Sequence, residues 1–217
     1  MTNRQQILAD LRAHLGQTDA ERRVKARQVY CIEDGVLLTD QPTWTTSYQH
    51  GDHVHDRAFI FDTKMRWEFR PDGELRHFTV GMILWRDGPT GRQYCLFRRT
   101  AHPIGFYTIA AGHLEMGEEP QAAALREAYE ETRLGVVHVQ LLYAAEEIAD
   151  ECRSGANFHV WRLYLGECIG EPALSEEGDI IGWYTEREIL EDLPLTQPTG
   201  HFCARLFGQS PQKVRAP

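Results

Sequence analysis

The first hydrophobic pattern in the chain has helical spacing. Within residues 4–15 the apolar positions recur every three or four residues, at Ile7, Leu8, Leu11 and Leu15, and Gly16 provides a stop. From Val29 to Leu75 the pattern changes to short β-like runs, which are separated by turn sequences such as Asp34-Gly35. The pattern predicts that residues 1–75 form a small N-terminal α+β extension. It assigns this extension no role.

Longer elements are predicted after Gly73. The hydrophobic and polar alternation favours strands at residues 77–86, 93–98, 106–110, 136–148 and 158–165. A helix is predicted from Pro120 to Arg133, since proline is favoured at the first position of a helix. Two further helices are predicted over residues 185–193 and 200–206. Strands followed by an embedded helix and closing helices indicate an α/β or α+β sandwich over residues 76–217.

The central helix carries three carboxylates on one face. Glu127, Glu130 and Glu131 stand at positions i, i+3 and i+4, while small or apolar residues form the opposite stripe. We expect these carboxylates to be exposed and mutually repulsive without metal, each pair costing about 0.2–0.5 kcal/mol. A divalent cation reverses that repulsion, and oxygen ligands suit Mg²⁺ or Mn²⁺. Taken alone, the three carboxylates are equally consistent with a solvated acidic face.

The loop before the helix favours a ligand site over a solvated face. Gly112 and Gly117 allow the backbone to approach a ligand closely. Glu118 precedes Arg126 by about two helical turns, which is close enough for a salt bridge between loop and helix. Beside the acidic face, Arg126 is interpreted as an orienting partner of the carboxylates.

Gly112, Glu118 and the run Arg126-Glu127-Ala128-Tyr129-Glu130-Glu131 resemble the signature of the Nudix hydrolase family. The resemblance implies the family's α/β/α sandwich with a mixed sheet, and makes residues 76–217 a Nudix hydrolase domain. One position departs from the signature, because its final glycine is Arg133 here. We therefore expect the helix to continue slightly and to use Gly135 as the residue after its C-cap.

The resemblance also implies roles for the signature residues. Glu127, Glu130 and Glu131 would ligate Mg²⁺, or Mn²⁺, with help from a backbone carbonyl near Ala111 and Gly112. Glu127 is a metal ligand or the general base, and the catalytic set is completed by two supporting residues, Arg126 and Glu118. In some members of the family a loop acid is the base instead, and the candidates here are Glu146, Glu147, Asp150, Glu151, Glu176 and Glu177.

The implied reaction is Mg²⁺-dependent hydrolysis of a pyrophosphate linkage in a nucleoside diphosphate or triphosphate derivative. Arg98, with its neighbour Arg99, is a candidate for binding phosphate, while Phe106 and Tyr107 are candidates for stacking on a base. Two subgroup marks are missing: a proline downstream of the box, typical of ADP-ribose hydrolases, and the Ser-Gln-Pro-Trp run of enzymes acting on reduced NAD. Nucleoside triphosphates, nucleotide sugars and other diphosphate-linked nucleosides remain open as substrates.

The composition of the chain limits the kinds of molecule that it is expected to bind. The 23 Lys and Arg against 32 Asp and Glu give a net charge of −9, so we expect a small nucleotide and no polynucleotide. No run of about 20 apolar residues predicts a membrane span. The 5 cysteines are scattered without a C-x-x-C pair, which predicts reduced thiols in the cytoplasm and neither a zinc knuckle nor a disulfide framework. The family resemblance also allows a homodimer.

Three further interpretations were weighed. A Nudix-fold module that senses nucleotides without cutting them would usually have lost box carboxylates, which this chain keeps. An isopentenyl-diphosphate isomerase-like enzyme would need a cysteine where Ala111 precedes Gly112 and His113. The sequence His53-Val54-His55 places two imidazoles on one side of a strand, but it lacks a clear third metal ligand and is better interpreted as a surface strand.

Overall fold

The computed structural model describes residues 3–17, 21, 23–24, 26–38, 47–89 and 91–208. The chain divides into two compact units. Unit 1 consists of Met1–Thr79, His113–Glu118 and Glu147–Val160, and unit 2 of Val80–Gly112, Glu119–Glu146 and Trp161–Pro217. Unit 1 therefore combines the predicted N-terminal extension with two short segments from the later part of the chain.

Within the described residues, the largest sheet has eight strands in the order β10-β11-β6-β7-β12, with β5 and β9 pairing with β6 and β8 pairing with β7. Antiparallel pairing places Leu84 opposite Cys95 in the β6–β7 hairpin, and β12 is antiparallel to β7. The strands predicted over residues 77–165 are present, whereas β5 and β12 were not predicted and β9 extends into residues expected to form a loop. The bounds are β5 Trp67–Phe69, β6 Leu75–Gly88, β7 Gly91–Arg99, β8 Tyr107–Thr108, β9 Ala110–His113, β10 Gly135–Ile148, β11 Phe158–Ile169 and β12 Gly178–Tyr184.

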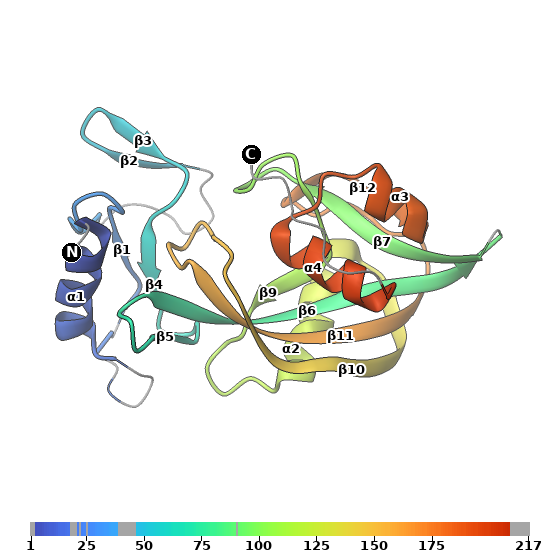
Figure 1. The fold of residues 1–217 in the computed structure, drawn as a ribbon, viewed down its shortest axis with the longest axis horizontal. Coiled ribbons are helices and arrows are strands. Elements are labelled where there is room, and N and C mark those ends of the chain that lie inside the picture. Colours follow the sequence, from blue (N-terminus) through green and yellow to red (C-terminus); the bar gives the residue numbers. More distant parts are fainter. Residues whose placement is uncertain are drawn as a thin grey trace. The chain divides into compact units, whose positions relative to one another are not determined.

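The helices of unit 2 are α2 Pro120–Thr132, α3 Glu186–Glu191 and α4 Gln197–Leu206. Figure 1 shows α2 behind the strands of the sheet and α4 in front of them, which gives the expected α/β/α layers. Pro120 opens α2, and the Glu119 side chain caps it by accepting a hydrogen bond from the backbone N–H of Gln121. The α+β class with a central mixed sheet is thus confirmed.

The expected end of α2 was wrong. The helix ends at Thr132, and Arg133 adopts the left-handed conformation with φ 60° while its N–H bonds the carbonyl of Tyr129. Gly135 instead begins β10. The Thr132 hydroxyl donates to the Ala128 carbonyl and accepts from the Leu134 N–H, which supports this abrupt turn from helix to strand. An arginine therefore occupies the left-handed position that the family's glycine normally fills.

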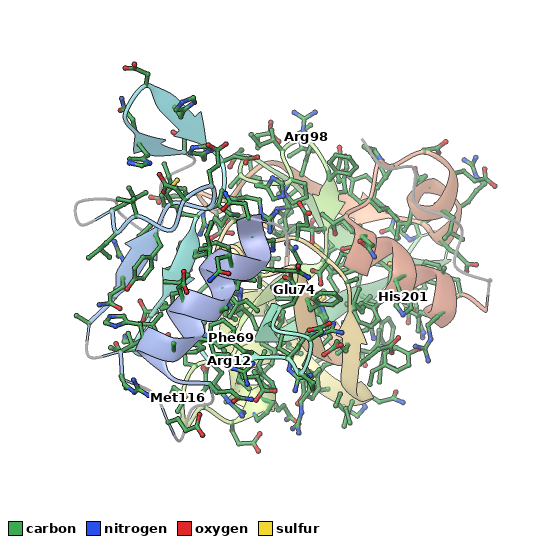
Figure 2. The ribbon with its side chains drawn as sticks, turned by 60° about the vertical axis from the view of Figure 1, so that its left-hand side comes forward. Arg12, Phe69, Glu74, Arg98, Met116 and His201 are labelled. Atoms are coloured by element: carbon green, nitrogen blue, oxygen red, sulfur yellow. The ribbon has the colours of Figure 1, made fainter. Side chains whose placement is uncertain are left out.

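Unit 1 has an aromatic core to which the first helix contributes. Leu8 and Leu15 of α1 (Asn3–Leu15) are each 1% exposed and belong to a buried cluster with Phe59, Phe61, Met65, Trp67, Phe69 and Leu75. Figure 2 labels Phe69 and Glu74 beside α1, and the Arg4 guanidinium forms an ion pair with Glu74 at 3.0 Å. The remaining strands of the unit are β1 Gln28–Tyr30, β2 Tyr48–His50, β3 His53–His55 and β4 Phe59–Phe61.

Three smaller features concern the histidines of β3, the cysteines and the hydrophobicity of the helices. Strand β3 carries His53 exposed and His55 half-buried, and the latter forms an ion pair with Glu33 at 3.7 Å. All five cysteines are free thiols. Across the described residues, no helix is both long and apolar enough to cross a membrane.

Candidate functional site

The three predicted carboxylates project from one face of α2, but their environments differ. The side chain of Glu130 is 55% exposed and that of Glu127 is 15% exposed. Glu131 is only 5% exposed. The expectation that the carboxylates are exposed therefore holds for Glu130 and is wrong for Glu131. Position i+4 on this face turns towards the interior, next to the buried Ala128 and Thr132.

Glu131 is a buried acid held against the backbone before the box. Its Oε2 accepts a hydrogen bond of 2.8 Å from the N–H of Ala111, in β9. Burial, and then the negative charges of Glu177 and Glu127, raise the pKa of Glu131 well above its usual range. The hydrogen bond from Ala111 and the positive charge of Arg99 act in the opposite direction. The site therefore concentrates negative charge where water screens it poorly, which is the environment that a dication would stabilise.

Gly112 leaves room for the carboxylate of Glu127 beside β9. A Cβ atom placed on Gly112 would lie 2.1 Å from the carboxyl carbon of Glu127, far inside van der Waals contact. Any side chain at this position would displace the Glu127 carboxylate from the backbone of β9. The sequence predicted that the backbone at Gly112 would come close to a bound molecule. In the structure it comes close to Glu127, a residue expected to bind the metal ion.

Arg126 bridges two of the acids. Its Nη1 lies 2.7 Å from Glu127 Oε1 and 3.2 Å from Glu130 Oε2. Arg126 therefore contacts two of the carboxylates that it is predicted to orient, and the orienting role itself remains a prediction. The Glu118 carboxylate accepts a hydrogen bond from the N–H of Glu115 at 3.3 Å, and its salt bridge with Arg126 remains a prediction.

Among the candidate loop acids, Glu177 acts on the site through its charge. It is the largest named contributor, after burial, to the raised pKa of Glu131. Four other candidates have cationic partners elsewhere: Glu146 with His201 and Arg205, Glu147 with Arg70 and Arg76, Asp150 with His159, and Glu151 with Arg57. The sequence could not choose among these acids, and which of them serves as base remains a prediction.

Arg98 is engaged by a neighbouring strand. Its guanidinium binds both carboxylate oxygens of Asp179, at 2.9 and 2.7 Å, and Figure 2 shows it at the surface. Tyr107 lies opposite Arg98 in the β7–β8 pairing, and its ring meets that of Tyr184 edge-on at 5.6 Å. Phe106 is partly exposed. The structure therefore places Arg98 and Tyr107 together, while the positive charge that acts on Glu131 is that of Arg99.

The sequence alone narrows the choice between Arg98 and Arg99 as the arginine nearer to Glu131, but it does not decide it. Successive residues of a strand point to opposite faces of the sheet, so Arg98 and Arg99 cannot both face α2. Deciding which one does requires the register of β7 against its neighbours. That register is a long-range property that hydrophobic alternation near the strand end does not supply.

Comparison with known proteins agrees with this geometry. The family model described as "NUDIX domain" matches residues 75–206. Two curated relatives, both named NAD-capped RNA hydrolase NudC, are 30% identical: one from Edwardsiella ictaluri over 52% of this chain and 40% of its own length, one from Citrobacter koseri over 56% and 44%. The chain thus spans less than half the length of these relatives.

Solved structures show the same fold at low identity. The NUDIX domain of Shewanella oneidensis NrtR, complexed with ADP ribose, has a TM-score of 0.53 and 16% identity, covering 64% of this chain and 92% of that domain. A MutT NUDIX hydrolase from Burkholderia pseudomallei has a TM-score of 0.50 and 23% identity, covering 60% and 96% respectively.

Proposed function

Because this chain belongs to the Nudix family, we propose that it hydrolyses a pyrophosphate linkage in a nucleoside diphosphate or triphosphate derivative, using Mg²⁺ or Mn²⁺. One observation carries the proposal. Glu131 is buried against the Ala111 N–H while Glu127 packs on Gly112 and Glu130 stays exposed beside them. This arrangement places the three carboxylates on one face of α2, with Glu127 and Glu131 held against the backbone of β9.

The donor set fits a hard dication. Glu127, Glu130 and Glu131 would hold the metal ion, with a backbone carbonyl near Ala111 and Gly112 as a further oxygen ligand. The bound ion would neutralise charge on the diphosphate and acidify the attacking water. The raised pKa of Glu131 supports this assignment, because crowded and buried carboxylates gain most from a nearby positive charge.

The remaining residues of the site have distinct tasks in this proposal. Arg126 orients Glu127 and Glu130, and Glu127 accepts the proton of the attacking water. Glu177 is the alternative base, supported by its electrostatic effect on Glu131. Phosphate would have to compete with Asp179 for Arg98, so Arg99 is the better candidate for stabilising charge near the box. Phe106 and Tyr107 remain the candidates for stacking on a nucleobase.

A second substrate class is favoured by the curated relatives. Their printed name assigns them hydrolysis of NAD-capped RNA, so an NAD-type dinucleotide is added to the candidates for this chain. The net charge of −9 argues against extended contact with an RNA backbone. We therefore place free dinucleotides ahead of capped RNA. A cytoplasmic location is part of the proposal and rests on the five free thiols.

The decisive experiment is a substrate screen combined with Glu130→Gln. Nucleoside triphosphates, nucleotide sugars, ADP-ribose, NAD in both redox states and NAD-capped RNA are incubated with Mg²⁺ or Mn²⁺, and released phosphate is measured with and without added phosphatase. For the substrate that is cleaved, Glu130→Gln should lower kcat by about 100-fold or more, since several kcal/mol of metal stabilisation are lost. Because Glu130 is exposed, the variant should fold normally.

Glu191→Gln is the matched control, since Glu191 is also an exposed helical glutamate paired with an arginine, but lies on α3. It should keep wild-type kcat. Undiminished turnover by Glu130→Gln would refute the metal assignment. Nucleotide binding without cleavage of any compound would instead support the non-catalytic sensing module.

A further inference from the structure

A second group of metal-ligating side chains lies in unit 1 and shares no residue with the three box carboxylates. His77 lies near the start of β6, and His113 is the last residue of β9. Cys152 lies in the turn before β11, and His159 lies in β11. One ligand atom from each of the four residues lies within 4.8 Å of all the others. This is a set of one thiol and three imidazoles.

Two of the six separations among these atoms match the edges of a tetrahedron around zinc. With Zn–N of about 2.0–2.1 Å and Zn–S of about 2.3 Å, tetrahedral coordination separates two nitrogens by about 3.3–3.4 Å and a sulfur from a nitrogen by about 3.6 Å. In the structure His77 Nδ1 lies 3.2 Å from His113 Nε2, and Cys152 Sγ lies 3.6 Å from His77 Nδ1. The three imidazole rings have centroids 4.8 to 5.8 Å apart.

The ring of His159 is oriented by a carboxylate. Its Nδ1 lies 2.9 Å from Asp150 Oδ1, and its side chain is 3% exposed. This contact directs the opposite nitrogen, Nε2, towards the cluster, as in the carboxylate–histidine–zinc arrangement of many metal sites. The charges also balance, because the two negative charges of a Cys152 thiolate and Asp150 equal the charge of a divalent ion.

The turn that carries Cys152 is held in place by other residues of unit 1. Arg57 donates hydrogen bonds to the carbonyls of Cys152 and Ala156, at 2.8 and 3.0 Å. Backbone bonds from Ala58 and Ile60 to the same turn attach it to β4, and Figure 1 shows this loop between β10 and β11 next to β4. The thiol is therefore positioned before any metal arrives, which lowers the entropic cost of binding.

Burial of His77 has no other explanation among the described residues. Its side chain is fully buried, and its Nε2 has no hydrogen-bond partner among them, so its polar contacts are made through Nδ1 with the cluster. Burying a polar ring with so few hydrogen bonds is costly. A metal bond at Nδ1 would offset part of this cost, while Nε2 would stay without a hydrogen-bond partner among the described residues.

We propose that His77, His113, Cys152 and His159 form a closed tetrahedral zinc site. Four protein ligands leave no position for water or substrate, so the ion would be structural. A mixed set of thiolate and imidazole selects zinc rather than the Mg²⁺ or Mn²⁺ expected at the box carboxylates. Because His113 directly follows Gly112, the ion would fix the start of the loop that leads into the signature helix.

The protonation tendencies differ within the cluster. Burial raises the pKa of the Cys152 thiol, but the charge of His159 and the surrounding imidazoles outweigh it and bring the net value well below the usual range. Burial lowers the pKa of His77 to about 4, so this imidazole is neutral at physiological pH. Burial also acts to lower the pKa of His159, but the charges of Asp150 and Cys152 outweigh it and raise the pKa to about 10. Zinc binds thiolates and neutral imidazoles, so His159 would release its proton on metal binding. The rival interpretation is a metal-free site with a reactive thiolate.

Metal analysis of the full chain tests the proposal. Protein purified without chelator should contain about one zinc per chain by mass spectrometry, and replacement by Co²⁺ should produce the absorption of a tetrahedral thiolate complex. Cys152→Ser should lose the thiolate-to-cobalt band and most of the zinc. Cys168→Ser is the control, because Cys168 is a buried thiol that donates a hydrogen bond to the Trp85 carbonyl and lies outside the cluster. This variant should keep both the thiolate-to-cobalt band and the zinc.

A second variant guards against misfolding of Cys152→Ser. Asp150→Asn keeps all four ligands and should weaken zinc affinity by about 10- to 100-fold in competition with a chromogenic chelator. Zinc content should be unchanged in Glu130→Gln. Loss of activity in Glu130→Gln and loss of zinc in the Cys152 and Asp150 variants are therefore separate outcomes. Absence of zinc, failure to bind added zinc or Co²⁺, and rapid alkylation of Cys152 by iodoacetamide would overturn the site.

Discussion

At the scale of single residues, the largest departure from the sequence-based expectation is the burial of Glu131. The signature places three glutamates on one helical face, and helical geometry alone predicts that they share an environment. How far each side chain enters the interior depends on what packs against the helix. The N–H of Ala111 in β9 donates a hydrogen bond to the buried Glu131 carboxylate in α2. This contact depends on how the two elements pack, which the helix sequence does not show. The residue types of the site were predictable, whereas their burial was not.

The raised pKa of Glu131 predicts a pH-dependent stability of the metal-free protein. A carboxyl whose pKa is higher in the folded than in the unfolded state contributes stability below the unfolded value, near 4.5, and loses it as pH rises through the folded value. In EDTA, the free energy of unfolding of the wild type should therefore fall over this range relative to Glu131→Gln. Urea unfolding of both proteins from pH 4 to pH 8 measures the difference.

Mg²⁺ supplies the control for that experiment. Added at pH 8, it should stabilise the wild type more than Glu131→Gln, since only the wild type has the ionised carboxylate to offer. Parallel pH profiles for the two proteins in EDTA would contradict the assigned burial of Glu131.

Gly112 provides a second prediction at the residue scale. In Gly112→Ala the new methyl group would overlap the carboxylate of Glu127, which must move away from β9. Metal-dependent turnover should fall by about 100-fold, because small misplacements of catalytic groups have effects of this size. Steady-state kinetics against Mg²⁺ concentration measure the loss.

The matched control is Gly135→Ala at the other end of α2. A Cβ there would meet its nearest atom, in Ile169, at 3.6 Å, which is ordinary contact. Turnover should be unchanged in this variant. Equal activity of Gly112→Ala and wild type would show that Glu127 need not pack on the β9 backbone.

At the scale of elements, local pattern was sufficient for most of the fold. Pro120 predicted the start of α2, although its end was misplaced, and the strands predicted over residues 77–165 were found with errors of up to four residues at their ends. β12 was missed because Gly178–Tyr184 has half-buried residues along much of its length and no clear alternation. Its pairing with β7 is what makes it a strand, and pairing depends on distant residues.

The end of α2 gives a prediction at this scale. Arg133 holds a left-handed conformation, which costs a residue with a side chain about 1–2 kcal/mol. Arg133→Gly removes that strain, and the greater entropy of glycine in the unfolded chain offsets part of the gain. We expect a net stabilisation of about 0.5–1 kcal/mol, measured by urea unfolding.

Arg133→Ala separates backbone strain from the side chain. It keeps the Cβ and therefore the strain, but removes the guanidinium that lies 5.4 Å from the ring centre of Tyr129. It should be no more stable than the wild type. A glycine variant that is less stable than the alanine variant would show that left-handed strain does not govern this helix end.

At the scale of the whole molecule, sequence reasoning separated the chain at residue 75, while the structure groups it differently. Unit 1 takes His113–Glu118 and Glu147–Val160 from the part that carries the Nudix signature. The four residues of the proposed zinc site lie in three separate segments of the chain, so no local spacing could reveal the whole set. The histidines that do stand close in sequence, His53 and His55, form no part of that cluster.

This grouping predicts how the N-terminal helix contributes to stability. Leu8 lies in the same buried cluster as Phe59, Trp67 and Ala156, and Cys152 packs against that cluster. Leu8→Ala leaves a cavity there and should destabilise the protein by about 2–5 kcal/mol. His14→Ala, at an exposed position of the same helix, should change stability by less than about 0.5 kcal/mol.

Hydrogen exchange then shows where the lost stability resides. If the units open separately, Leu8→Ala should accelerate exchange in β4, β5 and the Cys152 turn more than in α2 and β7, because those segments share its core. Zinc bound at the proposed site would oppose the same opening, so chelation should accelerate exchange in these segments of the wild type as well. Uniform acceleration across both units would mean that the chain unfolds as a single cooperative body, and the N-terminal residues would then stabilise the catalytic helix as much as their own core.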